Sequence, residues 1–372
     1  MRASNVSGLI FANANDKLIN KLTTKRSMAS IPYGARYRLI DFSLSNLVNA
    51  GITRIGILTK ENYRSLMDHV GSGIYWDLDR KNGGIYFLPP YITSSAKRYS
   101  GTVDALNGAR DYIKHCKSEY MVLCNADSLA NVDVASAIES HVKNEADITL
   151  IYHNGTVFSN TGETMLIDMD KSGRVKGISF NGEGGNEASF SIGITIIGRN
   201  LLLKLIDEAV ENELVSFNID VICNKLKQLK VYGVEHNGYV RFMNSPHGYY
   251  NASMDLLDGE VRSQLFNKER PIYTKTRDDM PTRYGVNTKV NNSLIADGCV
   301  IKGTVKNSIL FRGVDVEEGA VVENCILMQE TKVGIDTQLR NVISDKNAVI
   351  GDGIVLKGTK QKNFFVKKNQ TI

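Results

Sequence analysis

Residues 345–356 read DKNAVIGDGIVL, which is two variants of a single six-residue unit placed end to end. A second tandem pair, FRGVDVEEGAVV, covers residues 311–322, and ADGCVI at residues 296–301 is a fifth variant. Glycine holds the third place of four units and Asn347 holds it in the other, while valine holds the fifth place of four units. This period predicts a parallel β-helix with glycine or asparagine at left-handed corners and the fifth-place aliphatic side chains in its interior.

The coil is expected to be left-handed and to cover residues 285–372, with an ordinary β-sandwich as the alternative. The flat, apolar faces of such coils bury poorly in a monomer, so the repeat favours an oligomer. The repeat by itself favours no particular number of subunits.

Residues 6–255 alternate apolar strand-like segments with helix-like ones. The strand-like segments are SGLIFA (7–12), ITRIGILT (52–59), YMVLCNAD (120–127) and ADITLIYH (146–153), and the helix-like ones are SLSNLVNAG (43–51), ENYRSLMDHV (61–70), TVDALNGARDYIKHC (102–116) and VASAIESHVKN (134–144). This alternation predicts an α/β domain over residues 1–255, with a doubly wound, mostly parallel, Rossmann-like sheet. A charged stretch at residues 256–284 is expected to link it to the coil. Ligands bind at the carboxyl ends of such strands, where residues 13–16 and Asp127 fall.

The composition excludes several classes of protein. The 372 residues are 42% hydrophobic and 23% charged, and the net charge of +5 falls short of the compact basic patch of a nucleic-acid binder. The five cysteines never form CxxC, so neither a zinc site nor a disulfide framework is expected, and a reducing cytoplasm is favoured. The N-terminus shows no signal-peptide pattern, and no apolar run approaches the ~18 residues of a membrane helix.

Three stretches resemble one family, the bacterial glucose-1-phosphate adenylyltransferases. They are YGARYRLIDFSLSNLVNAGITRIGILTK (33–60), YSGTVDAL (99–106) and LRNVISDKNAVIGDG (339–353), and RLIDFSLSN (38–46) is the most specific match. The resemblance covers nearly the whole chain. It implies a nucleotidyltransferase domain followed by a hexapeptide β-helix. It also implies a link to the reaction that joins ATP and glucose 1-phosphate into ADP-glucose and pyrophosphate for glycogen synthesis, with Mg²⁺ as the metal.

The first loop departs from the family pattern GGxGTRLxxLTxxRAKPAV. An ungapped match places the three glycines on Asn13, Ala14 and Asp16, the arginine on Leu18 and the lysine on Met28. The loop has therefore lost the glycines that let backbone N–H groups close around a phosphate, and it has lost two cationic side chains. It has also gained an acid that repels a triphosphate. Loss of one preorganised donor is typically worth ~3 kcal/mol in the transition state.

Two further positions depart from the resemblance. Nucleotidyl transfer needs Mg²⁺ to neutralise the triphosphate, and two carboxylates usually hold the metal. Asp127 matches the first of them, but Phe242 stands at the place of the second, so Asp127 is at most a lone ligand and is otherwise a strand-end acid. Asn181 stands where the family has a lysine for the sugar phosphate. No catalytic position is therefore expected to be intact.

This pattern of losses resembles the GlgD-type subunits of Gram-positive bacteria. These are paralogues of the catalytic GlgC-type chains and assemble with them into heterotetramers. The resemblance implies a regulatory subunit with little or no activity of its own, which would use Mg²⁺ and ATP only through its catalytic partner. The alternative that this chain forms homo-oligomers by itself also stays open.

Some binding positions resemble the family pattern and stay candidates. Residual nucleotide or sugar contact would fall on the family's adenine-side segment, at Tyr99, Gly101, Thr102 and Asp104. The glycine and threonine equally suit a tight turn into a helix. The effector or anion candidates are Lys25, Arg26 and Arg38. Their alternatives are solvated lysine and arginine side chains and a structural ion pair between Arg38 and Asp41.

Two other functions compete with the regulatory subunit. The first is an active sugar-phosphate nucleotidyltransferase with an atypical loop, which requires a new carboxylate in place of the lost one. Asp16 is the only new acid in the loop, and it lies at the wrong strand end. The second is a hexapeptide-repeat acyltransferase, which usually uses a histidine of the coil as its base, and no histidine follows His247.

Overall fold

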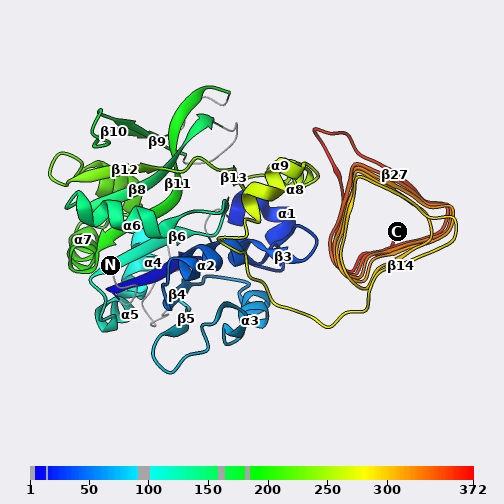
Figure 1. Ribbon diagram of the computed structural model, residues 1–372, viewed down its shortest axis with the longest axis horizontal. Helices are drawn as coiled ribbons and strands as arrows, with labels where there is room; N and C mark the ends of the chain where they lie inside the picture. Colours follow the sequence, from blue (N-terminus) through cyan, green and yellow to red (C-terminus); the bar gives the residue numbers. More distant parts are fainter. Residues whose placement is uncertain (1–4, 14–15, 91–100, 158–163, 181–184) are drawn as a thin grey trace.

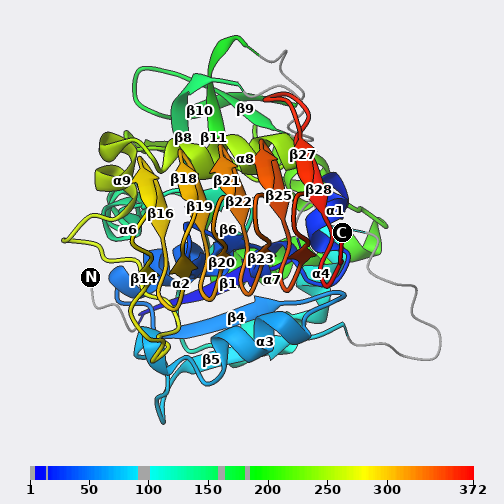
Figure 2. The same ribbon diagram turned by 90° about the vertical axis from the view of Figure 1, so that its right-hand side faces the viewer.

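The computed structural model describes residues 5–13, 16–90, 101–157, 164–180 and 185–372. Figure 1 shows an open sheet covered by helices, and beside it a coil that is seen end-on as a triangle. Figure 2, turned by 90°, shows the coil strands side by side in front of the sheet domain. The α/β domain and the hexapeptide β-helix expected from the sequence are both confirmed.

The N-terminal sheet has nine strands among the described residues, and its centre is parallel. Its strands are β1 (Val6–Phe11), β4 (Arg54–Leu58), β5 (Gly84–Leu88), β6 (Tyr120–Asn125), β8 (Ile148–Thr156), β9 (Met165–Met169), β10 (Val175–Phe180), β11 (Glu187–Gly198) and β12 (Val231–Glu235). Their order is β10-β9-β11-β6-β1-β4-β5, with β8 pairing β11 and β12. Strands β6, β1, β4 and β5 run parallel, whereas β11 is antiparallel to β6. The carboxyl ends of β1 and β6 therefore meet at one edge.

Helices cover both faces of this sheet. They are α2 (Leu39–Asn49), α3 (Arg64–Val70), α4 (Thr102–Gly108), α5 (Arg110–His115), α6 (Val134–Lys143) and α7 (Arg199–Glu211). Helices α1 (Asn20–Thr23), α8 (Pro246–Asp255) and α9 (Gly259–Leu265) pack instead in the apolar cluster shared with the coil. Successive side chains of a strand point to opposite faces, so Ile10 packs with α2 and α6 while Leu9 packs with α4, α5 and α7. Both faces of β1 are buried, which explains its unbroken apolar sequence.

Two short ribbons lie outside the main sheet. Strand β2 (Pro32–Tyr33) pairs with β3 (Tyr37–Arg38), and β7 (Ser128–Leu129) pairs with β13 (Arg241–Phe242), both antiparallel. The second ribbon brings residues separated by more than a hundred positions in sequence to the same place beyond the end of β6.

The coil consists of three parallel sheets of five strands each. The first sheet has β14 (Arg283–Tyr284), β17 (Val300–Ile301), β20 (Asp315–Val316), β23 (Lys332–Val333) and β26 (Val349–Ile350). The second has β15 (Lys289–Asn291), β18 (Thr304–Lys306), β21 (Val321–Glu323), β24 (Gln338–Arg340) and β27 (Val355–Lys357). The third has β16 (Leu294–Ile295), β19 (Ile309–Leu310), β22 (Ile326–Leu327), β25 (Val342–Ser344) and β28 (Phe364–Val366).

The corners of the coil follow the sequence, but its interior does not. The third-place residues Gly313 and Asn347 have φ values of 68° and 58°, the left-handed conformation that the repeat predicts. The prediction that fifth-place valines fill the interior is wrong, because Val355 is 53% exposed while the sixth-place Ile350 is 1% exposed. The alternation of side chains along each short strand turns the fifth place outward and the sixth inward.

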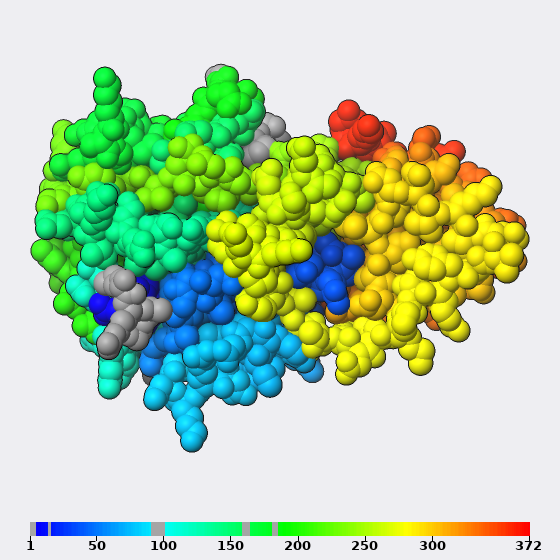
Figure 3. Space-filling view, viewed as in Figure 1, coloured from blue at the N-terminus to red at the C-terminus, as the bar shows by residue number. Residues whose placement is uncertain are grey.

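The segment 256–284, expected from the sequence to be a linker, contains helix α9 and the first coil strand, β14. The coil and the sheet domain share one buried apolar cluster, to which Tyr33 and Tyr249 contribute from one side and Phe311 and Ile343 from the other. Figure 3 shows the two parts in contact along this boundary. Among the described residues, no helix has the length and apolarity needed to cross a membrane.

Candidate functional site

The first loop, which follows β1, is closed by its own side chains. The Asp16 carboxylate accepts hydrogen bonds from the Asn13 side-chain amide, at 2.6 Å, and from the Met28 backbone N–H, at 2.8 Å. The Asn13 side-chain oxygen accepts the Lys60 N–H at 2.8 Å, which ties the loop to the end of β4. The Asp16 carboxylate therefore already accepts hydrogen bonds from donors that an incoming phosphate would need.

The altered positions Asp16, Leu18 and Met28 of this loop each have a structural role or a surface position. Burial raises the pKa of Asp16, because removal from water disfavours the charged form of its carboxyl group. Leu18 lies on the surface of the short 3-10 helix Asp16–Ile19, and Met28 is fully buried in the core between the domains. Ala14 lies outside the described residues. None of the residues Asp16, Leu18 and Met28 offers a positive charge to a phosphate.

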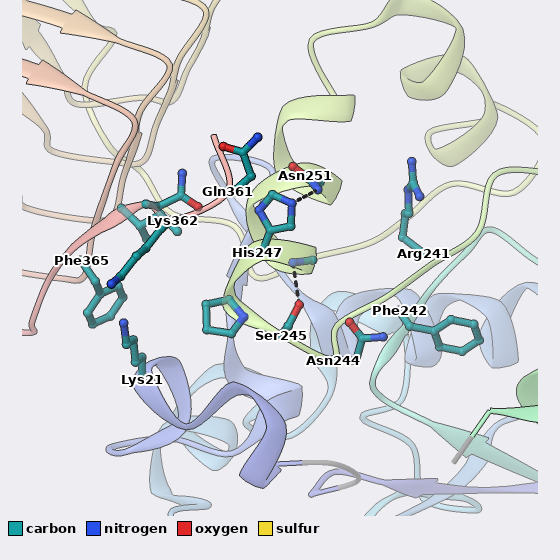
Figure 4. Close-up of a pocket in the computed structure, with 14 residues that line it drawn as sticks. Lys21, Arg241, Phe242, Asn244, Ser245, His247, Asn251, Gln361, Lys362 and Phe365 are labelled. Carbon is teal, nitrogen blue, oxygen red and sulfur yellow. Dashed lines mark hydrogen bonds between the residues drawn. The ribbon is translucent and has the colours of Figure 1, made fainter. Parts of the chain in front are cut away.

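The two metal positions expected from the family come together, but only one is a carboxylate. The Met243 N–H donates to the Asp127 backbone oxygen at 2.8 Å, and Phe242 pairs with Ser128 across the β7–β13 ribbon. The Phe242 ring packs on Phe190, with 5.8 Å between the ring centroids, and Figure 4 shows it turned toward the sheet domain.

These residues do not fit a magnesium site of two carboxylates, because a phenyl ring offers no ligand beside the buried Asp127. Within the described residues, no group of three or more His, Cys, Asp or Glu side chains could hold a metal ion. The sugar-phosphate position Asn181 lies outside the described residues.

The segment 101–104 packs tightly against the chain before the π-helix Phe217–Cys223. A Cβ added at Gly101 would lie 2.3 Å from the Val215 backbone oxygen, so only glycine fits there. The Val103 N–H donates to the same oxygen at 3.1 Å, and the Thr102 hydroxyl accepts the Phe217 N–H at 2.8 Å. Asp104 is half-buried in α4, and Tyr99 lies outside the described residues. The contacts of Gly101 and Thr102 are thus with the chain itself.

The anion candidates separate into one exposed and two inward-facing residues. Lys25 is exposed, whereas Arg26 is 2% exposed and its Nη2 lies 2.6 Å from the Asp345 Oδ1 of the coil. Arg26 Nη1 has no hydrogen-bond partner among the described residues. Arg38 donates from Nη1 to the Ser65 backbone and hydroxyl oxygens, and burial lowers its pKa to about 10.

The alternative of an ion pair between Arg38 and Asp41 is not formed in the described part of the chain. The Asp41 carboxylate accepts the Arg38 backbone N–H at 2.9 Å and contacts His69 Nε2 at 2.6 Å instead.

Lys346 joins these arginines and was missed by the sequence analysis. Burial, and then the positive charges of Arg38 and Arg26, lower the pKa of Lys346 to about 6. Such a shift requires the lysine to be desolvated beside like charges. Its position directly after Asp345 in a matched stretch was the available signal. Arg26, Arg38 and Lys346 therefore form a cluster of basic side chains, of which Lys346 is mostly neutral at pH 8, near the contact of Arg26 with the coil.

Comparisons with known proteins agree with this architecture. Residues 15–179 match the family model "Nucleotidyl transferase", and residues 279–369 match "GlmU-like, C-terminal hexapeptide". The chain is 38% identical to "Glycogen biosynthesis protein GlgD" of Geobacillus stearothermophilus and 34% identical to that of Bacillus subtilis, each over 97% of this chain and 95% of the relative.

It is also 31% identical to "Glucose-1-phosphate adenylyltransferase" of Bacillus mycoides, over 96% of both chains. Nucleotidyltransferases typically use a nucleoside triphosphate and Mg²⁺. The identity and the coverage together show that the chain belongs to the glucose-1-phosphate adenylyltransferase family, in which it is similar to the GlgD proteins of glycogen biosynthesis.

Proposed function

We propose that this chain is a regulatory subunit with little or no catalysis of its own. It assembles with a GlgC-type glucose-1-phosphate adenylyltransferase and changes the rate of that partner in glycogen synthesis. The observation that carries this proposal is the closed first loop, in which Asp16 takes the Met28 N–H and the Asn13 amide.

The electrostatics of the loop oppose a triphosphate. A phosphate that approached Asp16 would meet a like charge, and it would have to displace two hydrogen bonds already made by the carboxylate. Two unit charges ~4 Å apart interact by ~4 kcal/mol at an effective dielectric constant of 20. Phe242, which packs on Phe190, offers no second carboxylate for a metal ion that would offset this repulsion. The repulsion at Asp16 and the missing carboxylate together raise the barrier by more than the one remaining acid, Asp127, can lower it.

Asp16 does not support the alternative of an active sugar-phosphate nucleotidyltransferase. Its carboxylate is directed at Met28 and Asn13, whereas the lost metal acid belongs beside Asp127 at the β7–β13 ribbon. Two separate places would have to be repaired before Mg²⁺ could hold a triphosphate.

Assembly is supported by the outer surface of the coil. Valines at the fifth place of the repeat are exposed in two of the three sheets, at Val321, Val349 and Val355, and Phe364 of the third sheet is exposed as well. Parallel coils of this kind associate through such faces. The sheet domain retains a complete core, so a partner can recognise the family fold.

Regulation is assigned to the cluster Arg26, Arg38 and Lys346, as a site for a small anionic effector. Arg26 already pairs with Asp345, so an anion there would bear on both the first loop and the coil. At pH 8, Lys346 with its pKa of about 6 is mostly neutral, and an anion would favour its charged form. Binding of inorganic pyrophosphate at pH 8 is therefore expected to take up a proton.

Calorimetry in two buffers of different ionisation enthalpy measures this uptake. The same titration with Lys346→Met is the control and should show weaker binding without uptake. The effector site would be contradicted if Lys346→Met bound pyrophosphate as tightly as the parent chain, or if binding to the parent chain took up no proton.

The function itself is tested by an assay of ADP-glucose formation from ATP, glucose 1-phosphate and Mg²⁺. The purified chain alone is expected to show no turnover above background. Addition of a GlgC-type chain from the same cell should form a stable complex whose rate or effector response differs several-fold from that of the GlgC-type chain alone. Robust turnover by this chain alone would contradict the proposal, and failure to form the complex would contradict the partner.

A further inference from the structure

Lys346 is an amine that lies among charges mostly of its own sign. It follows Asp345 in the coil and is half-buried, so a small solute can reach it. Burial and the positive charges of Arg38, Arg26 and Lys368 disfavour its ammonium form, whereas the carboxylate of Asp345 favours it. These groups come from the N-cap of α2, from the first loop and from the last turn of the coil, and together they lower the pKa of Lys346 to about 6.

The amine of Lys346 is therefore a nucleophile at pH 8. A lysine with a pKa of about 6 carries no proton in most molecules at that pH, and a neutral lysine amine beside other cations is the activated form of this nucleophile. The effector site proposed above uses this amine only as a proton acceptor. Its nucleophilic character calls for an electrophile whose product is stable among cationic side chains.

Arg26 supplies an independent sign that an anionic group is missing beside this amine. The Arg26 side chain is 2% exposed, and its Nη1 has no hydrogen-bond partner among the described residues. Its Nη2 donates to Asp345 Oδ1 at 2.6 Å, and the same oxygen accepts the Lys346 backbone N–H at 2.7 Å. The unpaired Nη1 thus belongs to the guanidinium that is held by the residue next to Lys346. A buried donor left without an acceptor typically costs about 1–3 kcal/mol, which a new acceptor at this place would recover.

The charge of the surroundings selects the electrophile. An acyl group transferred to Lys346 would leave a neutral amide, and an aldehyde would leave an imine that can take up a proton and become cationic. Carbon dioxide instead converts a neutral amine into a carbamate, which is an anion, and anions form the strong hydrogen bonds of guanidinium groups. The small size of carbon dioxide also suits the place, because neither Lys346 nor Arg26 lines the cavity of about 410 Å³ beside α8.

We infer that Lys346 is a reversible carbamylation site, at which carbon dioxide bonds to the side-chain nitrogen and Arg26 binds the product. The Nζ lone pair forms a bond to the carbon of CO₂, one C=O π bond opens onto its oxygen, and one N–H proton leaves to water. The neutral amine and CO₂ thus give the carbamate and one proton, without an oxidant, a reductant or a metal. A carbamate oxygen accepts the Arg26 Nη1–H, and the positive charge of Arg38, which acts on the same amine, attracts the carbamate as well.

The carbamate changes the cluster Arg26, Arg38 and Lys346 from a site for anions into a site that holds its own anion. This regulatory part of the inference rests on the effector site proposed above. Pyrophosphate and the carbamate compete for the same guanidinium groups, and a carbamylated Lys346 can no longer take up a proton. Carbon dioxide is therefore expected to weaken pyrophosphate binding several-fold.

Chemical trapping on the full chain tests the covalent step directly. The chain is equilibrated at pH 8 with isotopically labelled bicarbonate and carbon dioxide and is then treated with triethyloxonium, which converts a carbamate into a stable ethyl ester. Peptide mass spectrometry is expected to find the labelled ester on Lys346 at least about tenfold more often than on the exposed Lys360 and Lys367, because ordinary lysine amines are mostly protonated at pH 8. Equal trapping on all three lysines, or none on Lys346, overturns the inference.

A conservative variant tests the part of Arg26. Arg26→Lys keeps a positive charge for Asp345 but removes the second donor, and it is expected to reduce trapping on Lys346 several-fold while the chain stays folded by circular dichroism. The matched variant Lys367→Met should leave trapping on Lys346 unchanged. Unchanged trapping in Arg26→Lys overturns the assignment of Arg26 as the group that binds the carbamate.

Pyrophosphate titrations separate this inference from the effector site on which its regulatory part rests. They compare buffers with and without carbon dioxide at the same pH. The parent chain should bind pyrophosphate several-fold more weakly with carbon dioxide, whereas the weaker binding by Lys346→Met should not respond. An equal response of Lys346→Met would identify bicarbonate as a simple competitor and overturn the regulatory part. Trapping on Lys346 without any pyrophosphate binding would refute the effector site and leave the carbamylation site standing.

Discussion

Arg26 Nη2 lies 2.6 Å from Asp345 Oδ1, and this buried ion pair joins the first loop of the sheet domain to the coil. The same Asp345 carboxylate accepts the Lys346 N–H at 2.7 Å. In the family resemblance, the residues around Arg26 belong to the phosphate-binding segment. Here this arginine is turned into the boundary between the two domains, where it contacts the coil in place of a ligand.

Replacement of Asp345 by Asn should therefore destabilise the chain strongly. It leaves the Arg26 guanidinium buried without its counter-charge, a change that typically costs about 3–5 kcal/mol. The free energy of unfolding from urea titration measures this loss. The exposed Asp352→Asn at a neighbouring corner is the control and should change the value by less than about 1 kcal/mol. Equal values for the two variants would show that the pair contributes nothing.

A second prediction concerns the orientation of the repeat. Ile350→Ala empties an interior position of the coil and should cost about 2–4 kcal/mol in the free energy of unfolding. Val349→Thr, one residue earlier, changes an outward side chain and should be nearly neutral in the isolated chain. A larger loss for Val349→Thr than for Ile350→Ala would contradict the inward direction of the sixth place.

The third prediction follows from the pKa of Lys346, which burial and the nearby arginines lower from 10.5 to about 6. In the unfolded chain the pKa returns to its ordinary value, so between pH 6 and 10.5 the unfolded state binds a proton that the folded state lacks. This group therefore makes stability rise with pH across that window. Lys346→Met should reduce the rise, as measured by urea unfolding at several pH values. An unchanged pH dependence would show that Lys346 is not desolvated.

Phe242→Asp tests whether one change can restore the chemistry. It sets a second carboxylate beside Asp127 and removes the packing of the ring on Phe190. The free energy of unfolding should fall by about 2 kcal/mol, because the ring is half-buried. No ADP-glucose should form, because Asp16 still occupies the first loop. Turnover by this variant with Mg²⁺ would show that the loop does not block a triphosphate, whereas Phe242→Leu should stay inactive with a smaller loss of stability.

Local sequence signals predicted much of this fold. The six-residue repeat placed the corners, because a left-handed backbone at positions such as Asn347 needs glycine or asparagine. The direction of the side chains could not be taken from the repeat, since both the fifth and the sixth places are aliphatic in most units. Residues 102–116 were expected to be one helix, but the chain bends at Ala109, whose ψ of 2° interrupts the helical geometry between α4 and α5.

The candidate site was predictable only in part. The pattern of lost residues identified Asp16 and Phe242, but the hydrogen bonds that Asp16 makes with Met28 and Asn13 depend on tertiary structure. Lys346 lies in a stretch that matches the family, but its proximity to Arg26 and Arg38 brings together segments about three hundred residues apart and has no local signal. Arg26 resembled a solvated loop residue until its partner in the coil was known.

The central claim is that this chain regulates without catalysing. Its most direct test is a complex of this chain with a GlgC-type partner whose own catalytic carboxylates have been replaced by amides. The rate of ADP-glucose formation by that complex is compared with the rate of the same partner left intact. The account predicts that the complex with the inactivated partner forms but makes no ADP-glucose, whereas the intact complex differs in rate or effector response from the partner alone. Turnover by the complex with the inactivated partner would locate catalysis in this chain and contradict the account.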